Sequence, residues 1–500
     1  MTRQASRSGP AIRLVILTGT LNLLMISGCR VGPNYHQPSA PAAPAFKEDA
    51  LVTPPPNPPG GGWKQVAPAD SAIRGKWWEV YNDPQLNELE EKIAVSNQSL
   101  KAAYDAYMQA LTAVQVFRSQ YFPTVSISPD ITNNQLSRNR ALYSRNPSST
   151  GSITNYNDLL LTGQALWEPD LWGSVRRAVE SQRATAQASA GDLANLDLSL
   201  QSQLASDYFQ MRGLDTQKQL LDNTVVQFQQ YYALTTTRFR GGVATESDVE
   251  LALTQLEQTR AQSIDVAAAR AQFEHAIAVL IGAPASSFSL ALAPLNLVLP
   301  PVPVGVPSQL LERRPDIAAA ERRADAANAQ IGVAIAAYYP TITLGGTGGF
   351  ESQRPGNWLQ GPSALWSLGG SATELLFDAG RRHAITQEAR LAYDQNVANY
   401  RQTVLQAFQE VEDNLADLRV LNDESSVQQR AVAAARRSTL VSTNRYTGGV
   451  TTYLEVITAQ TVQLANEETA ASINTRQFTA SVGLITALGG GWDRTQLPNP

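Results

Sequence analysis

Two long stretches of the chain favour helix throughout and contain no proline. They run from Ser174 to Phe209 and from Arg381 to Leu418, and they are rich in Ala, Gln, Leu, Arg and Glu. Their apolar residues leave only a narrow stripe on an otherwise polar surface. A helix of about 65 residues spans about 100 Å, which is longer than a globular core. Such helices need partners alongside them, as in coiled coils.

Between the helical stretches lie short segments in which apolar and polar residues alternate. The clearest is YYPTITLGGTGGF from Tyr338, followed by LLLTGQALW from Leu159, the segment around Val125 and Ile127, and a weaker case, WSLGGSATELLF, from Trp366. A period of two indicates strands. Strands of about ten residues with one lipid-like face are typical of outer-membrane barrels, although a soluble hairpin with one buried face gives the same pattern.

Four strands are too few to close a barrel, because the smallest known barrels have about eight. An open sheet edge in lipid would leave backbone groups unpaired at several kcal/mol each. If these strands cross a membrane, the missing strands must therefore come from other subunits. The alternation thus predicts an oligomer.

The whole plan occurs twice in the chain. RFRGGVATESDVELA from Arg238 resembles RYTGGVTTYLEVITA from Arg445, and each arginine follows an earlier glycine, Gly173 or Gly380, by 65 residues. SQYFPTVSIS from Ser119 likewise resembles AAYYPTITLG from Ala336. Each half is predicted to form a helix, a hairpin, a very long helix, a glycine turn and a shorter helix.

The N-terminus has the pattern of a bacterial lipoprotein signal. Arginines precede an apolar run from Leu14 to Ile26, which is shorter than the roughly twenty residues of a membrane span. Ile26-Ser27-Gly28-Cys29 then resembles a lipobox, in which Cys29 becomes the first residue and carries lipid; the alternative is a chance cysteine in an ordinary signal. Arg30 favours transfer to the outer membrane. A proline-rich tether, expected to be extended and without a core, runs from Gln37 to Gly62.

Composition adds mainly exclusions. The formal charge is −5, and no basic patch indicates a nucleic-acid partner. The histidines His36, His275 and His383 are scattered without metal-ligand spacing, and no nucleophile or paired carboxylates suggest catalysis. The GGTGGF run follows a strand pattern and opens no helix, so it does not indicate a phosphate loop. Neither an enzyme nor a cofactor is expected, apart from the lipid on Cys29.

The chain resembles the TolC-like outer membrane factors, in particular the lipoprotein branch called NodT-type efflux channels. The resemblance covers nearly all of the mature chain. It depends on GCRVGPNYHQP at the lipid site, KWWEVYNDPQLNELEEKIAVSNQSL from Lys76, LLERRPDIAAAERR from Leu310, the paired YFPT and YYPT segments, the two GGV turns, and ALGGGW near the end. One such motif would be weak evidence, whereas six in order are specific.

This resemblance implies a mainly helical homotrimer with a membrane β-barrel portion. Each subunit would contribute four strands to a twelve-stranded barrel in the outer membrane of a Gram-negative bacterium, and the long helices would form a periplasmic tunnel. The function it implies is the exit duct of a tripartite efflux pump, which passively conducts small molecules. Its partners would be a periplasmic adaptor and an inner-membrane transporter, often a proton-driven one of the RND type.

The two glycine turns are expected to reverse the helical hairpins at the periplasmic end of the tunnel. The predicted turn and adaptor-contact residues are Gly241, Gly242, Val243, Gly448, Gly449 and Val450. After each turn, Thr245 with Asp248 and Thr452 with Glu455 form a Thr-x-x-acid pattern typical of a capping box.

Asp248 and Glu455 have two interpretations. They either only cap helices or also line the closed tip as rings of carboxylates, which would favour cations in a narrow throat. The resemblance places constricting acids at these positions and an aromatic closing residue at Tyr446. Thr451 and Thr458 stand where some relatives carry a basic residue and a second acid, so the number of rings stays open. Arg238 and Arg445 are either a latch or C-terminal helix charges.

Two rival functions remain at this point, an outer channel for protein secretion and a non-pore coiled-coil lipoprotein scaffold. The arginines of LLERRPDIAAAERR favour structural ion pairs over a ligand site. The predicted organisation is a signal peptide at residues 1–28, a lipidated tether at 29–75, a first repeat at 76–292, a linker at 293–307, a second repeat at 308–490 and a tail at 491–500.

Overall fold

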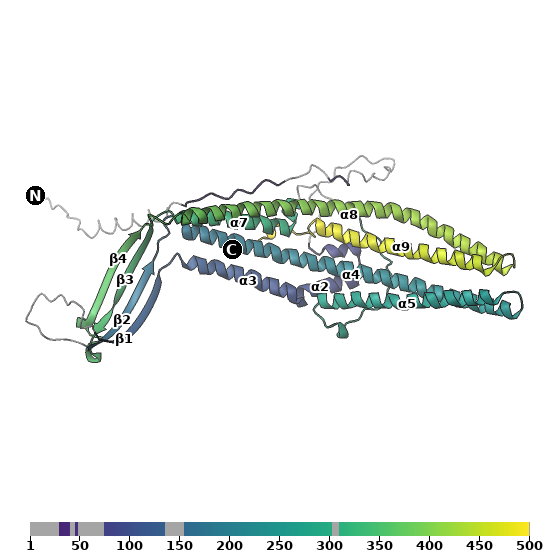
Figure 1. The fold of residues 1–500 in the computed structure, drawn as a ribbon, viewed down its shortest axis with the longest axis horizontal. Coiled ribbons are helices and arrows are strands. Elements are labelled where there is room, and N and C mark those ends of the chain that lie inside the picture. Colours follow the sequence, from purple (N-terminus) through teal and green to yellow (C-terminus); the bar gives the residue numbers. More distant parts are fainter. Residues whose placement is uncertain (1–29, 41–45, 49–74, 136–154, 303–309, 500) are drawn as a thin grey trace, which may run out of the picture.

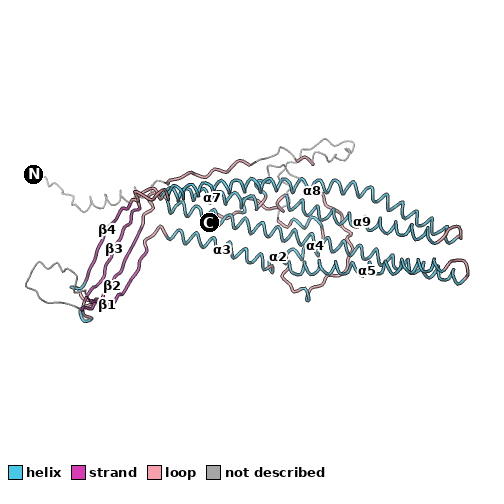
Figure 2. Tube along the Cα trace, in the orientation of Figure 1, coloured by secondary structure: helices cyan, strands magenta, loops and turns pink. Residues whose placement is uncertain are grey.

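The structure is a computed structural model that describes residues 30–40, 46–48, 75–135, 155–302 and 310–499. The signal peptide and Cys29 therefore lie outside the described residues. The molecule is elongated, with a sheet at one end and a bundle of long helices extending away from it (Figure 1). The tube drawing shows that the strands are confined to that one end (Figure 2).

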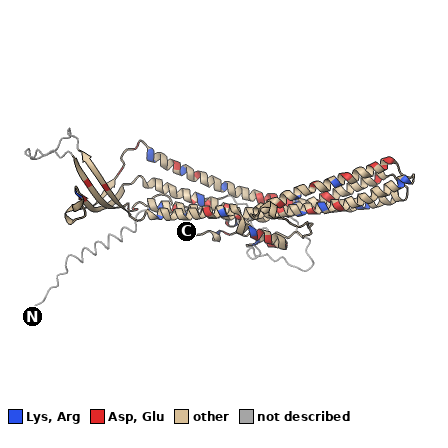
Figure 3. Ribbon diagram, turned by 90° about the horizontal axis from the view of Figure 1, so that it is seen from below, with Lys and Arg blue, Asp and Glu red and all other residues tan. Residues whose placement is uncertain are grey.

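The sheet has four antiparallel strands in the order of the sequence. They are β1 (Thr124–Gln135), β2 (Asn155–Trp167), β3 (Thr341–Ser352) and β4 (Ala364–Thr373). The two predicted hairpins pair with each other through β2 and β3, where Trp167 lies opposite Leu344. β1 and β4 are the edges, and neither has a partner strand among the described residues. Charged side chains are sparse in the sheet and frequent along the helices (Figure 3).

Two very long helices, α4 (Ser174–Arg240) and α8 (Arg381–Thr447), run the length of the bundle, and each has 67 residues. The shorter helices α3 (Gln98–Ser119) and α7 (Pro315–Ala336) pack near the sheet. At the far end, α5 (Glu246–Leu280) folds back along α4, and α9 (Tyr453–Ala487) folds back along α8. Each repeat therefore supplies one continuous helix and two helices that follow each other along it.

Both long helices begin in the same way. Gly173 and Gly380 precede them with φ of 80° and 87°, a left-handed conformation that favours glycine. Asp170 accepts hydrogen bonds from the backbone N–H groups of Val175 and Arg176, and Asp378 does the same for Arg382. These carboxylates satisfy donors that a helix start otherwise leaves free.

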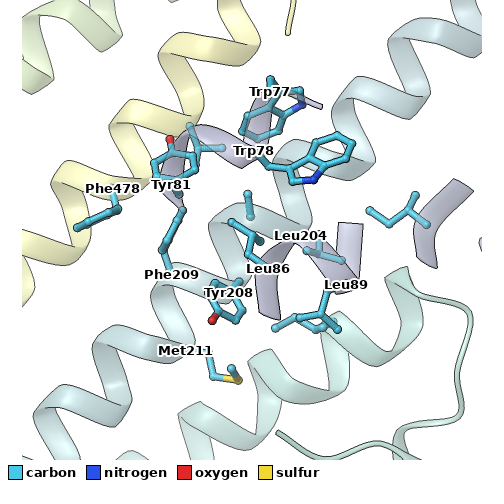
Figure 4. Packing of buried hydrophobic residues seen from close by; sticks show 14 of the residues in the cluster. Trp77, Trp78, Tyr81, Leu86, Leu89, Leu204, Tyr208, Phe209, Met211 and Phe478 are labelled. Atoms are coloured by element: carbon cyan, nitrogen blue, oxygen red, sulfur yellow. The ribbon is translucent and has the colours of Figure 1, made fainter. Parts of the chain in front are cut away.

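The main hydrophobic core lies near the middle of the bundle and is built by the KWWEVYNDPQL motif. Trp77 and Tyr81 are buried, and the short helix α2 (Pro84–Ser96) adds Leu86 and Ile93. Tyr81 packs edge-on against Phe209 of α4, whose ring lies 4.9 Å from that of Phe478 on α9 (Figure 4). This cluster therefore joins the two repeats at one level of the helical bundle.

Three of the four arginines of the LLERRPDIAAAERR motif, Arg314, Arg322 and Arg323, form ion pairs, as the sequence favoured. Arg314 is buried, and its guanidinium donates to both carboxylate oxygens of Asp316 at 3.0 and 2.7 Å. It also donates to Glu410 of α8 and to the carbonyl of Ala487 at the end of α9. One side chain thus joins the start of α7 to two other helices.

The described parts of the N-terminal tether lie against the helices rather than free of them. Arg177 of α4 is fully buried and donates to the carbonyls of Val31 and Gly32. Farther along, Phe46 is 3% exposed and packs in a cluster with Val411 of α8 and Leu484 of α9. The expectation that the tether has no core is wrong at Phe46. This aromatic ring packs into an apolar site on the helical bundle.

Within the described ranges, no helix has an apolar stretch sufficient to cross a bilayer.

The buried carboxyl of Glu90 generates a prediction about pH. Glu90 of α2 is 1% exposed, and neither of its side-chain oxygens has a hydrogen-bond partner in the described part of the chain. Burial, with a smaller contribution from nearby Asp197, raises the pKa of Glu90 to about 9. Folded Glu90 is therefore protonated at neutral pH, whereas unfolded Glu90 is ionised. Between the two pKa values, stability falls as pH rises, by at most about 1.4 kcal/mol per pH unit.

Glu90→Gln removes this titration, so its Tm should exceed that of the wild type at pH 8 and approach it at pH 5. Thermal unfolding followed by circular dichroism in detergent measures both values. Glu91→Gln is the control, because Glu91 is the exposed neighbour that pairs with Lys76. Equal shifts for the two variants, or a constant gap across pH, would contradict the prediction.

Candidate gate at the hairpin tips

The two hairpins end in turns of the same type at the end of the bundle remote from the sheet (Figure 1). The N–H of Val243 donates to the carbonyl of Arg238, and that of Gly242 donates to Phe239. Val450 and Gly449 repeat both bonds with Arg445 and Tyr446. This pair of bonds is a Schellman motif, which satisfies the last carbonyls of a helix and needs one left-handed residue.

Only the second glycine of each pair is left-handed. Gly242 and Gly449 have φ of 76° and 74°, whereas Gly241 and Gly448 have φ of −79° and −76°. Positive φ, which glycine allows without strain, is therefore used only at the second glycine of each pair. The first glycine of each pair has helical φ and only leaves this exposed helix end without a side chain.

The helix starts after the two turns differ. Thr245 and Asp248 form the predicted capping box: the Asp248 N–H donates to the threonine Oγ1, and the Thr245 N–H donates to Asp248 Oδ2 at 3.0 Å. Thr452 makes no side-chain cap, so the capping box predicted for Thr452 and Glu455 is wrong. Glu455 instead accepts from Arg445 Nη1 at 3.0 Å, across the turn of its own hairpin.

The matching arginine, Arg238, reaches the other hairpin. Its Nη1 donates to the carbonyl of Tyr446 at 3.0 Å, and its guanidinium carbon lies 4.5 Å from the centre of the Tyr446 ring. The carbonyl belongs to the last turn of α8, where the helix dipole attracts a cation. Arg238 therefore lies in the last turn of its own helix and also contacts the other hairpin, whereas a role as a latch stays a prediction.

Tyr446 is the centre of a small core between the hairpins. It is 3% exposed and packs against Tyr453, with the ring centres 5.5 Å apart. Ala252 and Val456 complete the buried cluster, and Tyr231 Oη lies 3.2 Å from Thr443 Oγ1 beside it. Sequence reasoning identified Tyr446 but missed Tyr453 and Tyr231, although tyrosines near both turns gave a visible signal.

The two predicted gate acids lie on different hairpins. Asp248 is half-buried and close enough to Tyr453 that its charge, after burial and the neighbouring tyrosines, helps to raise the pKa of that phenol. Glu455 is exposed, and its side chain is 47% accessible. No direct contact between Asp248 and Glu455 is found in the described residues. Both carboxylates nevertheless belong to the same end of the bundle.

A second functional surface consists of the edges of the chain. On β1, Val125, Ile127 and Ile131 are 67–78% exposed, and on β4, Trp366 and Leu368 are 81 and 82% exposed. The long helix α8, which continues beyond β4, also exposes apolar side chains over most of its length; these are Ile385, Leu391, Leu405, Val420, Val427, Leu440 and Val441. Apolar rows beside unpaired strands indicate contact surfaces.

These features define an elongated membrane channel subunit, in which a partial barrel wall continues into two long helical hairpins. Residues 89–283 and 306–490 match the profile of the family described as outer membrane efflux protein. The chain belongs to this family.

Individual relatives agree with that assignment. The chain is 30% identical over 486 residues to the probable efflux pump outer membrane protein TtgC of Pseudomonas putida, covering 95% of this chain and 96% of that one. It is 28% identical to the cation efflux system protein CusC of Escherichia coli, with 94 and 97% coverage. Among solved structures, the outer-membrane channel OprN aligns with a TM-score of 0.81 and 30% identity, covering 93% of this chain and all of that one.

The chain is therefore an outer-membrane component of an efflux pump in a Gram-negative bacterium, and it extends into the periplasm. The predicted fold class, two repeats of long helices and a hairpin that build a helical tunnel and a barrel, is confirmed. The efflux relatives also decide against the rival functions of protein secretion channel and scaffold.

The turn geometry predicts unequal effects of alanine at adjacent glycines. Gly242→Ala forces a Cβ into the left-handed region, which costs about 1–2 kcal/mol, although no atom lies within 4 Å of that Cβ. Gly241→Ala keeps helical φ and places its Cβ 3.5 Å from two carbonyl oxygens, an ordinary contact. Hydrogen exchange of the 235–250 segment should therefore be about tenfold faster in Gly242→Ala and unchanged or slower in Gly241→Ala. Equal exchange in the two variants would refute this account of the turn.

Proposed function

We propose that three copies of the chain form one exit duct that is closed at the hairpin tips in the conformation described here. The carrying observation is the pair of open edges. β1 and β4 lack partners among the described residues, and an unpaired strand edge in lipid costs several kcal/mol for each backbone group. Joining β1 of one copy to β4 of the next removes every edge, and three copies give the twelve strands of a barrel.

The helices support the same arrangement. In the half of the bundle near the sheet, the helices follow one another as α3, α4, α7 and α8, so α3 and α8 are the outer members. In the other half, α5 and α8 are outermost. The same side of the molecule thus carries β4 and α8, and the opposite side carries β1, α3 and α5. One continuous contact between neighbouring copies would cover the exposed apolar residues of both sides.

The gate is proposed to be the contact between hairpins. Arg238 and Tyr446 hold the two tips of one subunit together, and three subunits would bring three copies of Asp248 and of Glu455 around one axis. Carboxylates crowded in a narrow throat attract cations and repel anions. A related channel, MtrE of Neisseria gonorrhoeae, has been solved in an open state, with a TM-score of 0.78 to this chain and 25% identity. Opening here would separate the hairpins and break the Arg238 contact.

The partners follow from the kind of pump. The duct carries out no chemistry itself. A periplasmic adaptor would dock on the exposed tips, where Val243 and Val450 are 69 and 71% exposed. An inner-membrane transporter, of the RND type by the family resemblance, would supply the cargo. Lipid on Cys29 would anchor the N-terminus, since Arg30 lies at the sheet end of α4 beside Glu180.

Removing the contact between hairpins should open the channel. Arg238→Gln loses the charged donor to the Tyr446 carbonyl and the stacking on its ring, so single-channel conductance in planar bilayers should rise severalfold, as expected for a loss of about 1–3 kcal/mol. The control is Arg445→Gln, which removes the matching arginine but breaks a bond within one hairpin only. Conductance that is unchanged in Arg238→Gln, or raised equally in both, would reject Arg238 as the closing contact.

The proposed carboxylate rings should control ion preference. Neutralising Asp248 and Glu455 as Asp248→Asn and Glu455→Gln should lower the cation-over-anion permeability ratio, measured from reversal potentials in a salt gradient, by a factor of about 2–10. Glu257→Gln, an exposed acid of α5 that pairs with Arg260, is the control. Unchanged selectivity would reject the rings while leaving the duct intact. Lipidated wild-type protein that stays monomeric and never conducts would reject the duct itself.

A further inference from the structure

A cavity of about 430 Å³ lies beside the first turns of α4, at the end of the bundle next to the sheet. Its lining comes from five separate segments: the N-terminal stretch that begins at Arg30, the loop before β1, the first turns of α4, α7, and the C-terminal tail at Asn499. On α4, Arg176, Glu180, Arg183 and Gln187 follow one another at intervals of four, three and four residues, so they share one helix face. This face provides the floor of the cavity.

Three arginines line the cavity: Arg30, Arg176 and Arg183. Arg176 is held by Asp170, to which its Nε donates at 3.0 Å. Arg30 pairs with Glu180, but Glu180 also accepts from the fully buried Arg177 at 2.9 Å, so one carboxylate balances two arginines. Arg183 is exposed and makes no hydrogen bond or ion pair with any other residue that the structure describes. The cavity therefore has positive charge that the chain itself does not neutralise.

A half-buried phenol completes the arrangement. Tyr121 lines the cavity, and its hydroxyl lies among Arg118, Arg176 and Arg183. Burial, followed by the charge of Asp170, raises the pKa of Tyr121, and these three arginines act in the opposite direction. The hydroxyl is thus a neutral donor next to guanidinium groups. Charged guanidinium donors and a neutral hydroxyl donor that line the same cavity are groups suited to bind a phosphate.

The acids of the cavity do not cancel this charge. Asp325 of α7 pairs with Arg322 at 3.3 Å, and burial is the main reason that its pKa is raised to about 6. Glu180 is occupied by Arg30 and Arg177, as described above. Gln187 adds an uncharged amide beside Arg183, with its nitrogen donating to the Pro498 carbonyl.

The position of the cavity identifies the source of the phosphate. Tyr121 precedes the first residue of β1 by three residues, and Trp167 at the end of β2 donates from its indole to the Tyr121 carbonyl at 3.0 Å. Trp172 stacks on Tyr339 at the same level, with ring centres 4.9 Å apart. Such aromatic residues mark the membrane–water interface of outer-membrane barrels. The cavity therefore opens at the depth of lipid headgroups on the periplasmic side.

We propose that Arg30, Arg176, Arg183 and Tyr121 bind the phosphate of an anionic phospholipid in the periplasmic leaflet of the outer membrane. Arg183 is the free cation that the lipid phosphate would neutralise, and Tyr121 is the neutral donor. Arg30 directly follows the residue proposed to carry the covalent lipid, so the bound phospholipid and the anchor would lie side by side. The site depends on the outer-membrane location of the chain and is independent of the gate.

Native mass spectrometry of the full-length, lipidated channel tests the site by titration with phosphatidylglycerol and, separately, phosphatidylcholine. Retention of phosphatidylglycerol should be stronger than that of phosphatidylcholine, and Arg183→Gln should weaken it about fivefold, as expected for one cation near a membrane surface. Tyr121→Phe should weaken it in the same direction. The control is Arg437→Gln, which removes another exposed arginine, on α8 toward the hairpin tips, without a described partner.

Three results would overturn the proposal. The first is equal phosphatidylglycerol retention in Arg183→Gln and Arg437→Gln. The second is equal retention of the two phospholipids by the wild type, which would indicate binding of acyl chains alone. The third is displacement of phosphatidylglycerol by millimolar inorganic phosphate, which would identify a site for free anions rather than for lipid. Because none of these measurements involves conduction, they separate this site from the proposed gate.

Discussion

The architecture depends on the need to pair every backbone hydrogen-bonding group of the sheet. Four strands in the order β1 to β4 satisfy each other internally and leave two edges that lipid cannot satisfy. A similar limitation applies to α8, whose apolar side chains stay exposed over most of its length in a single copy of the chain. A chain with these properties is complete only as part of a closed ring. The exposed apolar residues of β1, β4 and α8 are thus the surfaces of that ring rather than defects of the fold.

The two repeats share the features that build the helical scaffold and differ in the side chains at the hairpin tips. Both repeats keep the left-handed glycine before the long helix, the helix length and the Schellman turn, because these are backbone requirements that only a few residues meet. The side chains at the tips have separated in role. Asp248 caps its helix, Glu455 pairs with Arg445, and Arg238 reaches across to Tyr446. Two identical hairpins would lack this one-sided contact. The sequence difference between the repeats therefore allows Arg238 of one tip to hold the other tip.

The sequence predicted what depends on local pattern and missed what depends on partners distant in the chain. The long helices, the four strands and the first capping box follow from composition, alternation and a Thr-x-x-Asp spacing, and each is present. The second capping box failed because Arg445 competes for Glu455, a choice that spacing does not reveal. The core position of Phe46 and the contact of Arg238 with Tyr446 join residues far apart in sequence, and a single sequence carries no signal for them. The lipid on Cys29 and the carboxylate rings remain predictions.

The position of the central core limits where the channel is able to move. Tyr81, Phe209 and Phe478 join α4 to α9, and Arg314 joins α7, α8 and the end of α9 near the same level. Between this level and the sheet, α4 packs on both α3 and α7, and the described N-terminal segment adds contacts to α4, α7 and α8. Beyond it, the two hairpins meet through polar side chains and two small apolar clusters, one of Leu221, Val266 and Leu464 and one around Tyr446. Close-packed aromatic cores resist deformation. A change in the width of the channel therefore costs least free energy at the hairpin tips, where few buried contacts have to be broken. A rigid upper duct with a weakly held end is therefore a consequence of where this sequence places its large aromatic residues.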